Sequence, residues 1–439
     1  MENKTNIRYL ALDLLIRCEK EKAFSNIAID TVIRRHSLTG ADRALLTALF
    51  YGVIEKKLTL DYIISKLSNI PKSKIETDTQ NLLRLGLYQL SFMDKIPQHA
   101  AVNETVALAK PRSRSFVNAL LRRFTRERDS ISFPSPDRDT AKYLSVRYSV
   151  GEPLCKRLLD VYGADECERL FDAISHNPPI TLRVNTLKTS TDALLSELSA
   201  NLPSAKRTKN APDGVTVDGV ALSELSALSN GLCTVQDEAS QICVAVLDAR
   251  AGDLVIDACA CPGSKSFGAA MDMKNEGKLL SFDIHENKLS LVQSGAERLG
   301  ISIISTEAHD AREPIESLLG AADRVICDVP CSGFGVIAKK PELRYKDPEE
   351  SKRLPEIQLS ILKTVSRYLK RGGVLVYSTC TLLPEENEGV LKKFLLENAD
   401  YSPVPFKIGE IDAKDGMITL LPHKHSTDGF FIAKLTRNN

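Results

Sequence analysis

Between residue 236 and the C-terminus, short apolar runs alternate with helical segments, and this alternation restricts the possible folds more than any other feature. Helical periodicity marks segments such as 287–300 and 356–370. Strands that alternate with helices are typical of a doubly wound parallel α/β sheet. We predict this fold for residues 236–439, with FFIAKL (430–435) as an antiparallel edge strand. The strand-like runs are LVIDACA (254–260), KLLSFDI (278–284), ISIISTEA (301–308), DRVICDVP (323–330) and GGVLVYSTC (372–380).

The rest of the chain divides into three further stretches. Residues 1–130 carry apolar residues at spacings of three and four, which predicts an all-α domain. Residues 130–146 contain two prolines and several polar residues and are expected to be a linker. Residues 147–235 mix helical and strand-like patterns, which predicts a small α+β module. Arg183 and Asn185 lie in one of its strands, where they either contact RNA or form an ordinary exposed face.

The net charge of +1 conceals an uneven distribution. Residues 1–150 carry 25 basic and 16 acidic side chains, whereas residues 151–439 carry 33 and 41. A basic front part favours a nucleic acid or another polyanion as partner. A basic helix face is often only a solvated surface, and that interpretation stays open. Given the surrounding positive charge, we expect RNA-backbone contact from one segment. Its basic residues are Lys110, Arg112, Arg114, Arg122, Arg123 and Arg126.

The ten cysteines are scattered along the chain and form no CxxC pair. This spacing disfavours a structural zinc site and a disulfide scaffold, and we expect no metal. We also find no signal peptide pattern and no apolar run near 18 residues. We therefore expect a reduced, cytoplasmic protein without a membrane segment.

The loop after the first strand-like run, DACACPGSKS (257–266), opens the next helical segment. It matches neither GxGxxG nor GxxxxGK[ST], because Cys259 and Ser264 stand where the phosphate loop needs glycines. Asp283 ends the second run, where an acid can accept both ribose hydroxyls. Asp310 follows the third run, in position to meet an adenine amino group. One such acid is more often a cap or turn residue, but together they suit an adenosyl ligand without phosphates, such as S-adenosylmethionine.

Two cysteines follow the fourth and fifth strand-like runs. The fourth continues into CDVPCSGFGV, with Asp328 and Cys331, and the fifth into YSTCTLLPEENE, with Cys380. Neighbouring strands lie about 4.8 Å apart, so both cysteines emerge side by side near the cofactor if these strands pair. A lone strand cysteine is usually a small buried hydrophobe. Two cysteines in loops of small residues at the ligand-binding end indicate chemistry instead.

These motifs resemble the Nop/Sun family of RNA cytosine-C5 methyltransferases. PCSG and STC at this separation, after an ACACPGSK loop, form a specific combination, and NTLK, VQDEAS and DGFFIAKL also match. The first domain resembles the NusB-type helical RNA-binding domain, so the resemblance covers nearly the whole chain. It implies a class I, Rossmann-like methyltransferase domain at 236–439, after a NusB-like domain and an RNA-recognition module at 147–235.

The resemblance also implies the activity. The cofactor would be S-adenosylmethionine and the partner 16S ribosomal RNA, bound by a monomer. Cytosine 967 would receive the methyl group on carbon 5. Cys380 would be the nucleophile that adds to carbon 6, and Cys331 would assist product release. Asp328 would donate a hydrogen bond to the N3 edge of the base. The residues implied in cofactor binding are Cys259, Ala260, Cys261, Pro262, Gly263, Ser264, Lys265, Asp283, Asp310 and Asp328.

The cofactor loop departs from the family pattern CAAPGGKT at Cys261, Ser264 and Ser266. Ser264 bears most on cofactor affinity, because a glycine there would serve either backbone freedom or close approach of the cofactor.

Two other functions are weighed against this one. A non-enzymatic RNA-binding or assembly factor would keep the basic front part, but the retained Cys331 and Cys380 argue against a decayed core. A cysteine hydrolase would pair Cys380 with His423 or His425, but no oxyanion-hole motif stands out. Adenine-directed methyltransferases are excluded, because the fourth strand carries PCSG and not an Asn/Asp-Pro-Pro-aromatic motif.

Overall fold

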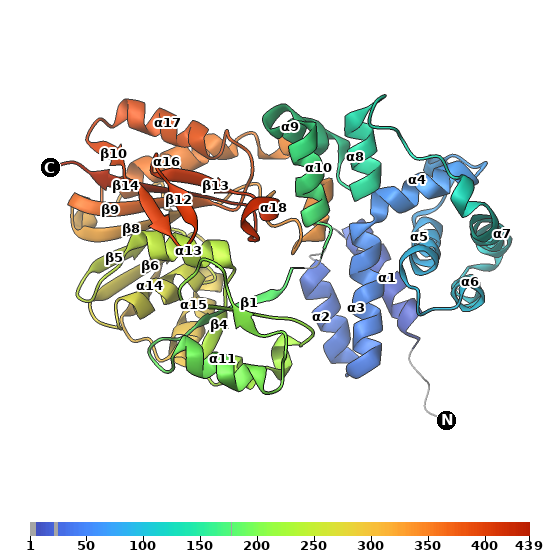
Figure 1. The fold of residues 1–439 in the computed structure, drawn as a ribbon, viewed down its shortest axis with the longest axis horizontal. Helices are drawn as coiled ribbons and strands as arrows, with labels where there is room; N and C mark the ends of the chain where they lie inside the picture. Colours follow the sequence, from blue (N-terminus) through green and yellow to red (C-terminus); the bar gives the residue numbers. More distant parts are fainter. Residues whose placement is uncertain (1–5, 22–24, 177) are drawn as a thin grey trace. The chain divides into compact units, whose positions relative to one another are not determined.

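The computed structural model describes residues 6–21, 25–176 and 178–439. The first five residues, where a signal peptide would begin, lie outside this range. By its internal contacts the chain divides into two compact units (Figure 1). The helical unit runs to Ser175 and includes Lys340–Asp347, and the sheet unit contains His176–Lys339 and Pro348–Asn439. No helix in the described part of the chain is long and apolar enough to span a bilayer.

The helical unit is built from amphipathic helices whose apolar faces share one core. Leu14, Leu46 and Leu83 come from three different helices and are fully buried in it. The all-α prediction for residues 1–130 is confirmed over the described residues. The helices are α1 (Ile7–Glu21), α2 (Ser25–Arg35), α3 (Gly40–Glu55), α4 (Lys57–Leu67), α5 (Thr77–Phe92), α6 (Gln98–Ala107), α7 (Pro111–Glu127), α8 (Thr140–Tyr148), α9 (Glu152–Tyr162) and α10 (Ala164–Ala173), with 3₁₀ turns η1 (Lys72–Lys74), η2 (Arg128–Ser130) and η5 (Pro341–Tyr345).

Helix α8 lies where the sequence predicts a linker, so the linker prediction is wrong from residue 140 onward. The carboxylate of Asp139 accepts a hydrogen bond from the backbone N–H of Lys142 at 2.9 Å, which caps the start of this helix. The prolines of this stretch precede the cap and therefore do not interrupt the helix. Helices α9 and α10 pack with α8 inside the helical unit, so the predicted 147–235 module is divided between the two units.

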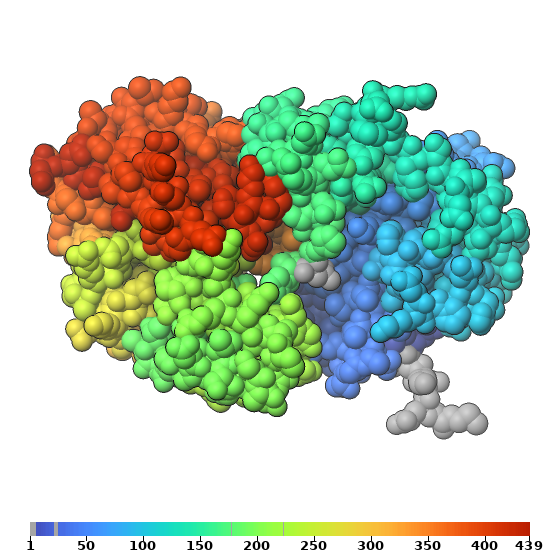
Figure 2. Space-filling view, viewed as in Figure 1, coloured from blue at the N-terminus to red at the C-terminus, as the bar shows by residue number. Residues whose placement is uncertain are grey.

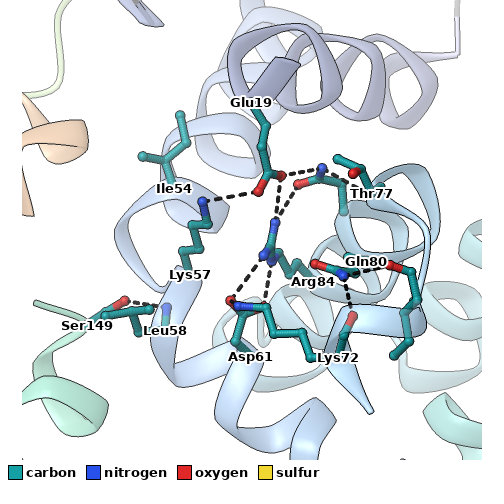
Figure 3. Close-up of polar contacts among 12 residues, drawn as sticks. Glu19, Ile54, Lys57, Leu58, Asp61, Lys72, Thr77, Gln80, Arg84 and Ser149 are labelled. Carbon is teal, nitrogen blue, oxygen red and sulfur yellow. Dashed lines mark hydrogen bonds and ion pairs between the residues drawn. The ribbon is translucent and has the colours of Figure 1, made fainter. Parts of the chain in front are cut away.

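Arg84 of α5 is buried in the helical unit with 1% of its surface exposed. Its guanidinium donates to both carboxylate oxygens of Asp61 on α4, at 2.7 and 3.0 Å, and to Glu19 on α1 at 2.9 Å (Figure 3). Lys57 also pairs with Glu19. Burial alone would raise the pKa of Glu19, but the charges of Arg84 and Lys57 lower it to about 2. This network joins three helices through charges that are all paired.

The sheet unit begins with a small antiparallel sheet in the order β2-β3-β1-β4. Arg183 on β1 is buried and pairs with Asp272 of α14 at 2.6 Å. The fully buried Asn185 donates from its amide to the backbone oxygens of Gly231 and Leu299. Both interpretations of these two residues, RNA contact and an exposed face, are wrong, because both side chains are buried against other parts of the sheet unit. The elements are β1 (Ile180–Val184), α11 (Thr191–Ser199), β2 (Lys206–Arg207), β3 (Gly214–Val217), η3 (Leu222–Glu224), α12 (Ser226–Ser229) and β4 (Cys233–Val235).

The large sheet of the same unit has eight strands, with the path β10-β14-β9-β8-β5-β6-β7 and β13 paired to β14. β5 to β9 are parallel, and the chain reverses its direction of progress across the sheet between β7 and β8. The doubly wound prediction is confirmed. The strands are β5 (Leu254–Asp257), β6 (Lys278–Asp283), β7 (Ile304–Ala308), β8 (Ala322–Asp328), β9 (Leu369–Thr379), β10 (Tyr401–Pro403), β13 (Met417–Leu420) and β14 (Phe430–Arg437).

Two apolar cores lie on opposite faces of this sheet. α13, α14 and α15 pack on one face, and α16 and α17 pack on the other. Side chains fill the spaces that the ribbon leaves open between strands and helices (Figure 2). FFIAKL forms β14, which is antiparallel as predicted, but it is not an edge strand because β10 and β13 also pair with it. The remaining elements are α13 (Glu238–Leu247), α14 (Ser264–Asp272), α15 (Glu286–Leu299), η4 (Glu316–Leu318), η6 (Pro348–Ser351), α16 (Leu354–Ser366), α17 (Glu388–Glu397), α18 (Pro422–His425) and the hairpin β11 (Phe406–Ile408) and β12 (Ile411–Ala413).

Candidate active site

Cys331 and Cys380 lie side by side at the carboxyl ends of β8 and β9. These strands are parallel, and Asp328 stands opposite Ser378 in their register. The chain therefore releases both cysteines at the same edge, with 3.0 Å between their sulfur atoms. The backbone N–H of Cys380 also points to the Cys331 sulfur, at 3.3 Å. The juxtaposition expected from strand adjacency is present.

The backbones of the two cysteine loops and of the residue before β14 approach one another so closely that a side chain on Gly335 would not fit between them. A Cβ on Gly335 would lie 1.8 Å from the backbone oxygen of Gly429 and 2.8 Å from that of Cys380. Gly335 N–H donates to the Cys380 oxygen at 2.9 Å, and Gly429 N–H donates to the Gly335 oxygen. The second glycine of PCSGFG thus has a packing reason, and it ties the Cys331 loop to the Cys380 loop.

Cys331 is a protonated thiol in this arrangement. Its hydrogen bond with Cys380, its burial and the nearby charges of Glu386 and Asp328 all raise its pKa well above the usual value. Of the two sulfurs, Cys331 is therefore suited to keep the shared proton and donate it toward Cys380. A thiolate, the reactive form of cysteine, is more easily formed on Cys380 when Cys331 donates to it.

A cavity of about 80 Å³ lies at the same edge of the sheet, at the carboxyl ends of β5 and β8. Lys265 pairs with Asp328 at 2.6 Å, and Ser378 donates to the other Asp328 oxygen, also at 2.6 Å. Burial alone would lower the pKa of Lys265, but Asp328 raises it above its usual value. Both Asp328 oxygens are acceptors here, so a proton-donating Asp328 would have to give up one bond. The cavity is lined by Asp257, Cys259, Ala260, Cys261, Pro262, Ser264, Lys265 and Asp328.

The other two predicted cofactor acids lie at the same edge of the sheet but do not line this cavity. Asp283 accepts hydrogen bonds from the backbone of Cys261 at 3.1 Å and of His285 at 2.9 Å, which orders the cofactor loop. Asp310 lies two residues beyond β7, where it pairs with Arg312. Hydrogen bonds from Arg312 lower the pKa of Asp310. Both carboxylates accept hydrogen bonds from their own loops at this edge.

The departures of the cofactor loop from its family pattern have local explanations. Gly263 has a φ of +106° and caps α14, so this position favours glycine. Ser264 is not among the residues with positive φ, so a glycine is not needed there for conformation. Ser264 is one of the residues that line the cavity. Ser266 donates to Asp257 at 2.6 Å, a bond that the hydroxyl of threonine would also make.

Asp257 and Ser378 have no predicted role, although both lie at strand ends on this edge. Asp257 is 1% exposed, and one of its oxygens has no hydrogen-bond partner among the described residues. Burial raises its pKa to about 7. Its place after the first strand was the only signal in the sequence, whereas the bond from Ser378 to Asp328 depends on the register of two strands.

The six basic residues predicted to contact RNA lie on or just before α7 and differ in their partners. Lys110 pairs with Asp78, Arg112 with Glu76 and Arg123 with Glu127. Within the described ranges, the other three are exposed and form no ion pair with an acid. These are Arg114, Arg122 and Arg126, which follow one another at multiples of four residues and so share one helix face.

His425 of the hydrolase alternative is engaged elsewhere. Its Nδ1 accepts a hydrogen bond from the backbone of Leu421 at 2.8 Å. Burial lowers its pKa. In this arrangement the ring nitrogen serves the turn at α18.

Three family models match consecutive parts of the chain. The model described as 16S rRNA methyltransferase RsmB/F matches residues 244–436, and the NusB family model matches residues 5–126. Between them, a ferredoxin-like domain model of the RsmF/B-like methyltransferases matches residues 152–221. Each match falls on elements of the corresponding predicted type.

Curated relatives and solved structures agree with these matches. A probable ribosomal RNA small subunit methyltransferase B from Bacillus subtilis is 38% identical over 99% of both chains. Ribosomal RNA small subunit methyltransferase B from Escherichia coli is 32% identical over the full length of both. The crystal structure of PH0851 superposes with a TM-score of 0.80 at 26% identity and full coverage. A methyltransferase homolog from Pyrococcus horikoshii, 28% identical with a TM-score of 0.60, spans 68% of this chain and 99% of its own. The chain therefore belongs to the 16S rRNA methyltransferase RsmB/F family.

Proposed function

We propose that this protein transfers a methyl group from S-adenosylmethionine to carbon 5 of a cytosine in 16S ribosomal RNA. The observation that carries the proposal is the pair of cysteine sulfurs 3.0 Å apart, at the edge of the sheet where the cavity also lies. Carbon 5 of cytosine is a poor nucleophile, and a thiol that adds to carbon 6 is a direct way to activate it. Membership in a family of 16S rRNA methyltransferases supports the choice of substrate.

The residues around the cavity fit S-adenosylmethionine. The unpartnered buried oxygen of Asp257 and the carboxylate of Asp328 make the cavity suitable for a cationic ligand. The first N–H groups of α14 and the ammonium of Lys265 suit a carboxylate on the same ligand. Asp283 and Asp310 at the rim are available acceptors for hydroxyl or amino groups. When bound, S-adenosylmethionine would supply an activated methyl group.

Cys380 and Cys331 would divide the covalent chemistry. The Cys380 thiolate adds to carbon 6, and the electron pair of the carbon 5–carbon 6 double bond becomes available to take the methyl group at carbon 5. A hydrogen bond from Asp328 to N3, with its proton supplied through Lys265 or Ser378, would stabilise this adduct. Loss of the carbon 5 proton through Cys331, whose thiol passes its own proton on to water as it takes the new one, re-forms the double bond and expels the Cys380 thiolate. Atoms and charge balance because carbon 5 loses one proton as it gains one methyl group, whose bond to the sulfonium sulfur would break and leave its electron pair on that sulfur.

The substrate would dock on the helical unit before its base enters the site. The exposed Arg114, Arg122 and Arg126 can neutralise phosphates without first breaking an ion pair. The target base must leave its stack to reach two strand ends. We extend the proposal to cytosine 967 as the target and to a cytoplasmic monomer as the active form.

The test is methylation of 16S rRNA in cells. Bisulfite sequencing of rRNA from a deletion strain should show loss of one 5-methylcytosine. Expression of the intact chain should restore it, and expression of Cys380→Ala should not. An unchanged methylation pattern in the deletion strain, or full restoration by Cys380→Ala, would contradict the proposal.

A further inference from the structure

Two buried hydrogen bonds hold the backbone on either side of Cys331, and both lead to Glu386. The N–H of Ser332 donates to Glu386 Oε2 at 2.9 Å. The amide of Gln358 donates to the backbone oxygen of Pro330 at 3.0 Å and to the same Glu386 oxygen at 2.9 Å. Because Pro330 and Ser332 flank Cys331 in the chain, Glu386 and Gln358 together fix both sides of this cysteine.

Glu386 itself belongs to the loop that carries Cys380. This loop leaves β9 and ends at α17, and the hydroxyl of Tyr377 on β9 donates to the backbone oxygen of Glu386 at 2.6 Å. A second link between the loops joins the hydroxyls of Ser332 and Thr381, 2.6 Å apart. Glu386 is therefore an acidic connection between the two cysteine loops, and any shift of its side chain changes where Cys331 lies relative to Cys380.

A carboxylate in this position is costly for folding. Glu386 is 1% exposed and Gln358 is fully buried. Oε1 of Glu386 has no hydrogen-bond partner in the part of the chain that the structure describes. A buried carboxylate with an unpaired oxygen destabilises a fold, whereas an apolar side chain of similar size would not. Packing alone gives no reason for an acid here, which points to a role in the reaction.

We propose that Glu386 is a positioning residue that holds Cys331 at the distance from Cys380 needed to release the methylated product. This proposal rests on the proposed function of the two cysteines. Glu386 acts through the backbone of Ser332, the amide of Gln358 and its nearby charge, and it does not touch the reacting atoms. Displacement of a reacting group by about 1 Å costs up to about a hundredfold in rate, so the expected effect is large without any change in substrate contacts.

The experiment compares three variants of the full-length protein with unmethylated 16S rRNA transcribed in vitro and tritium-labelled S-adenosylmethionine. Glu386→Leu removes the acceptor, and Glu386→Gln keeps an oxygen that can accept from Ser332. Glu388→Leu, two residues away with an exposed side chain, is the matched control. Methyl transfer, KM for both substrates and the fraction of enzyme covalently attached to RNA on denaturing gels are measured together.

Glu386→Leu should lower kcat by about a hundredfold and KM with it, so that kcat/KM changes little, and its protein–RNA adduct should persist, because Cys380 still attacks while a displaced Cys331 fails to release. Glu386→Gln should recover most of the rate, and Glu388→Leu should match the wild type. The proposal is overturned if Glu386→Leu turns over normally, or if it loses activity without adduct accumulation. If the leucine variant does not fold, Gln358→Leu removes the bond to Pro330, and normal adduct release there also overturns it. Failure of the wild type to methylate the RNA would contradict the proposed function instead.

Discussion

The helical unit and the sheet unit each bury a cation paired with carboxylates beside a cavity, and the larger cavity is not the proposed active site. The cavity of the helical unit has a volume of about 290 Å³ and adjoins Arg84, Glu19 and Lys57. The cavity of the sheet unit has only about 80 Å³ and adjoins Lys265, Asp328 and Asp257. Size alone would therefore select a different place from the proposed site.

The difference lies in what the buried groups still lack. Within the described ranges, Arg84 and its partners leave no buried side-chain nitrogen or oxygen unpaired, so their bonding capacity is used for joining helices. In the sheet unit, Asp257 keeps one unpaired buried oxygen, and the two proposed catalytic cysteines lie at the same edge of the sheet. Saturated buried charge indicates architecture, and unsatisfied buried charge beside nucleophiles indicates chemistry.

The largest expected effect is on the stability of the helical unit. Arg84→Met leaves the carboxylate of Asp61 buried with only Lys72 as a partner. Loss of one member of a buried ion pair should lower the free energy of unfolding by about 3 kcal/mol. Chemical denaturation followed by circular dichroism measures this loss. Unchanged affinity for S-adenosylmethionine is the control, and a variant as stable as the wild type would break the comparison.

The corresponding change in the sheet unit should act on function more than on stability. Lys265→Met exposes Asp328 to the cavity, where water can solvate it, so we expect a loss of stability of only about 1 kcal/mol. Affinity for S-adenosylmethionine, measured by calorimetry, should fall about a hundredfold because the ammonium is lost from the cavity wall. Wild-type affinity would show that this pair is as purely structural as the Arg84 network.

A third expectation separates paired from unpaired basic residues on α7. Replacing Arg114, Arg122 and Arg126 together by alanine should weaken binding of 16S rRNA about tenfold or more. It should also reduce the slope of log affinity against log salt concentration by about 2. Replacing the acid-paired residues should have a smaller effect, because their charges are already compensated; these are Lys110, Arg112 and Arg123. Filter binding at several salt concentrations distinguishes the two triple variants. A larger loss for the acid-paired set would contradict the assignment.

The smallest effect is a pH dependence of opposite sign in the two units. The pKa of Glu19 is lowered to about 2, so its contribution of about 1 kcal/mol is present above pH 4.5 and disappears as the pH falls toward 2. The pKa of Asp257 is raised to about 7, so its buried charge costs stability near pH 7, and this cost disappears as the pH falls toward 4. Hydrogen exchange is measured by mass spectrometry and corrected for intrinsic rates. As the pH is lowered from 7 to about 3, protection of backbone amides should rise around β5 and fall around α1. Glu19→Gln and Asp257→Asn should remove the respective trends.

Strand alternation was sufficient to predict the large sheet and to place Cys331 and Cys380 at strand ends, because strand ends follow from local patterns. Their meeting was expected only on the condition that the two strands pair, which the structure shows. Long-range partners could not be predicted in this way. Arginine is usually a surface residue, so the sequence around Arg183 does not predict its burial. Its ion pair with Asp272, 89 positions later, explains it. Glu386 lies 54 positions from Ser332 and 28 from Gln358, so nothing in its own motif marks it as their common acceptor.

The most direct test of the proposed chemistry replaces each of the two cysteines by alanine, one at a time. Cys331→Ala and Cys380→Ala are each incubated with 16S rRNA and S-adenosylmethionine, and the products are separated on a denaturing gel. If Cys380 attacks and Cys331 releases, Cys331→Ala accumulates a protein–RNA adduct, while Cys380→Ala forms neither adduct nor 5-methylcytosine. An adduct with Cys380→Ala and none with Cys331→Ala would reverse the roles, and methylation by both variants would contradict covalent catalysis by this pair.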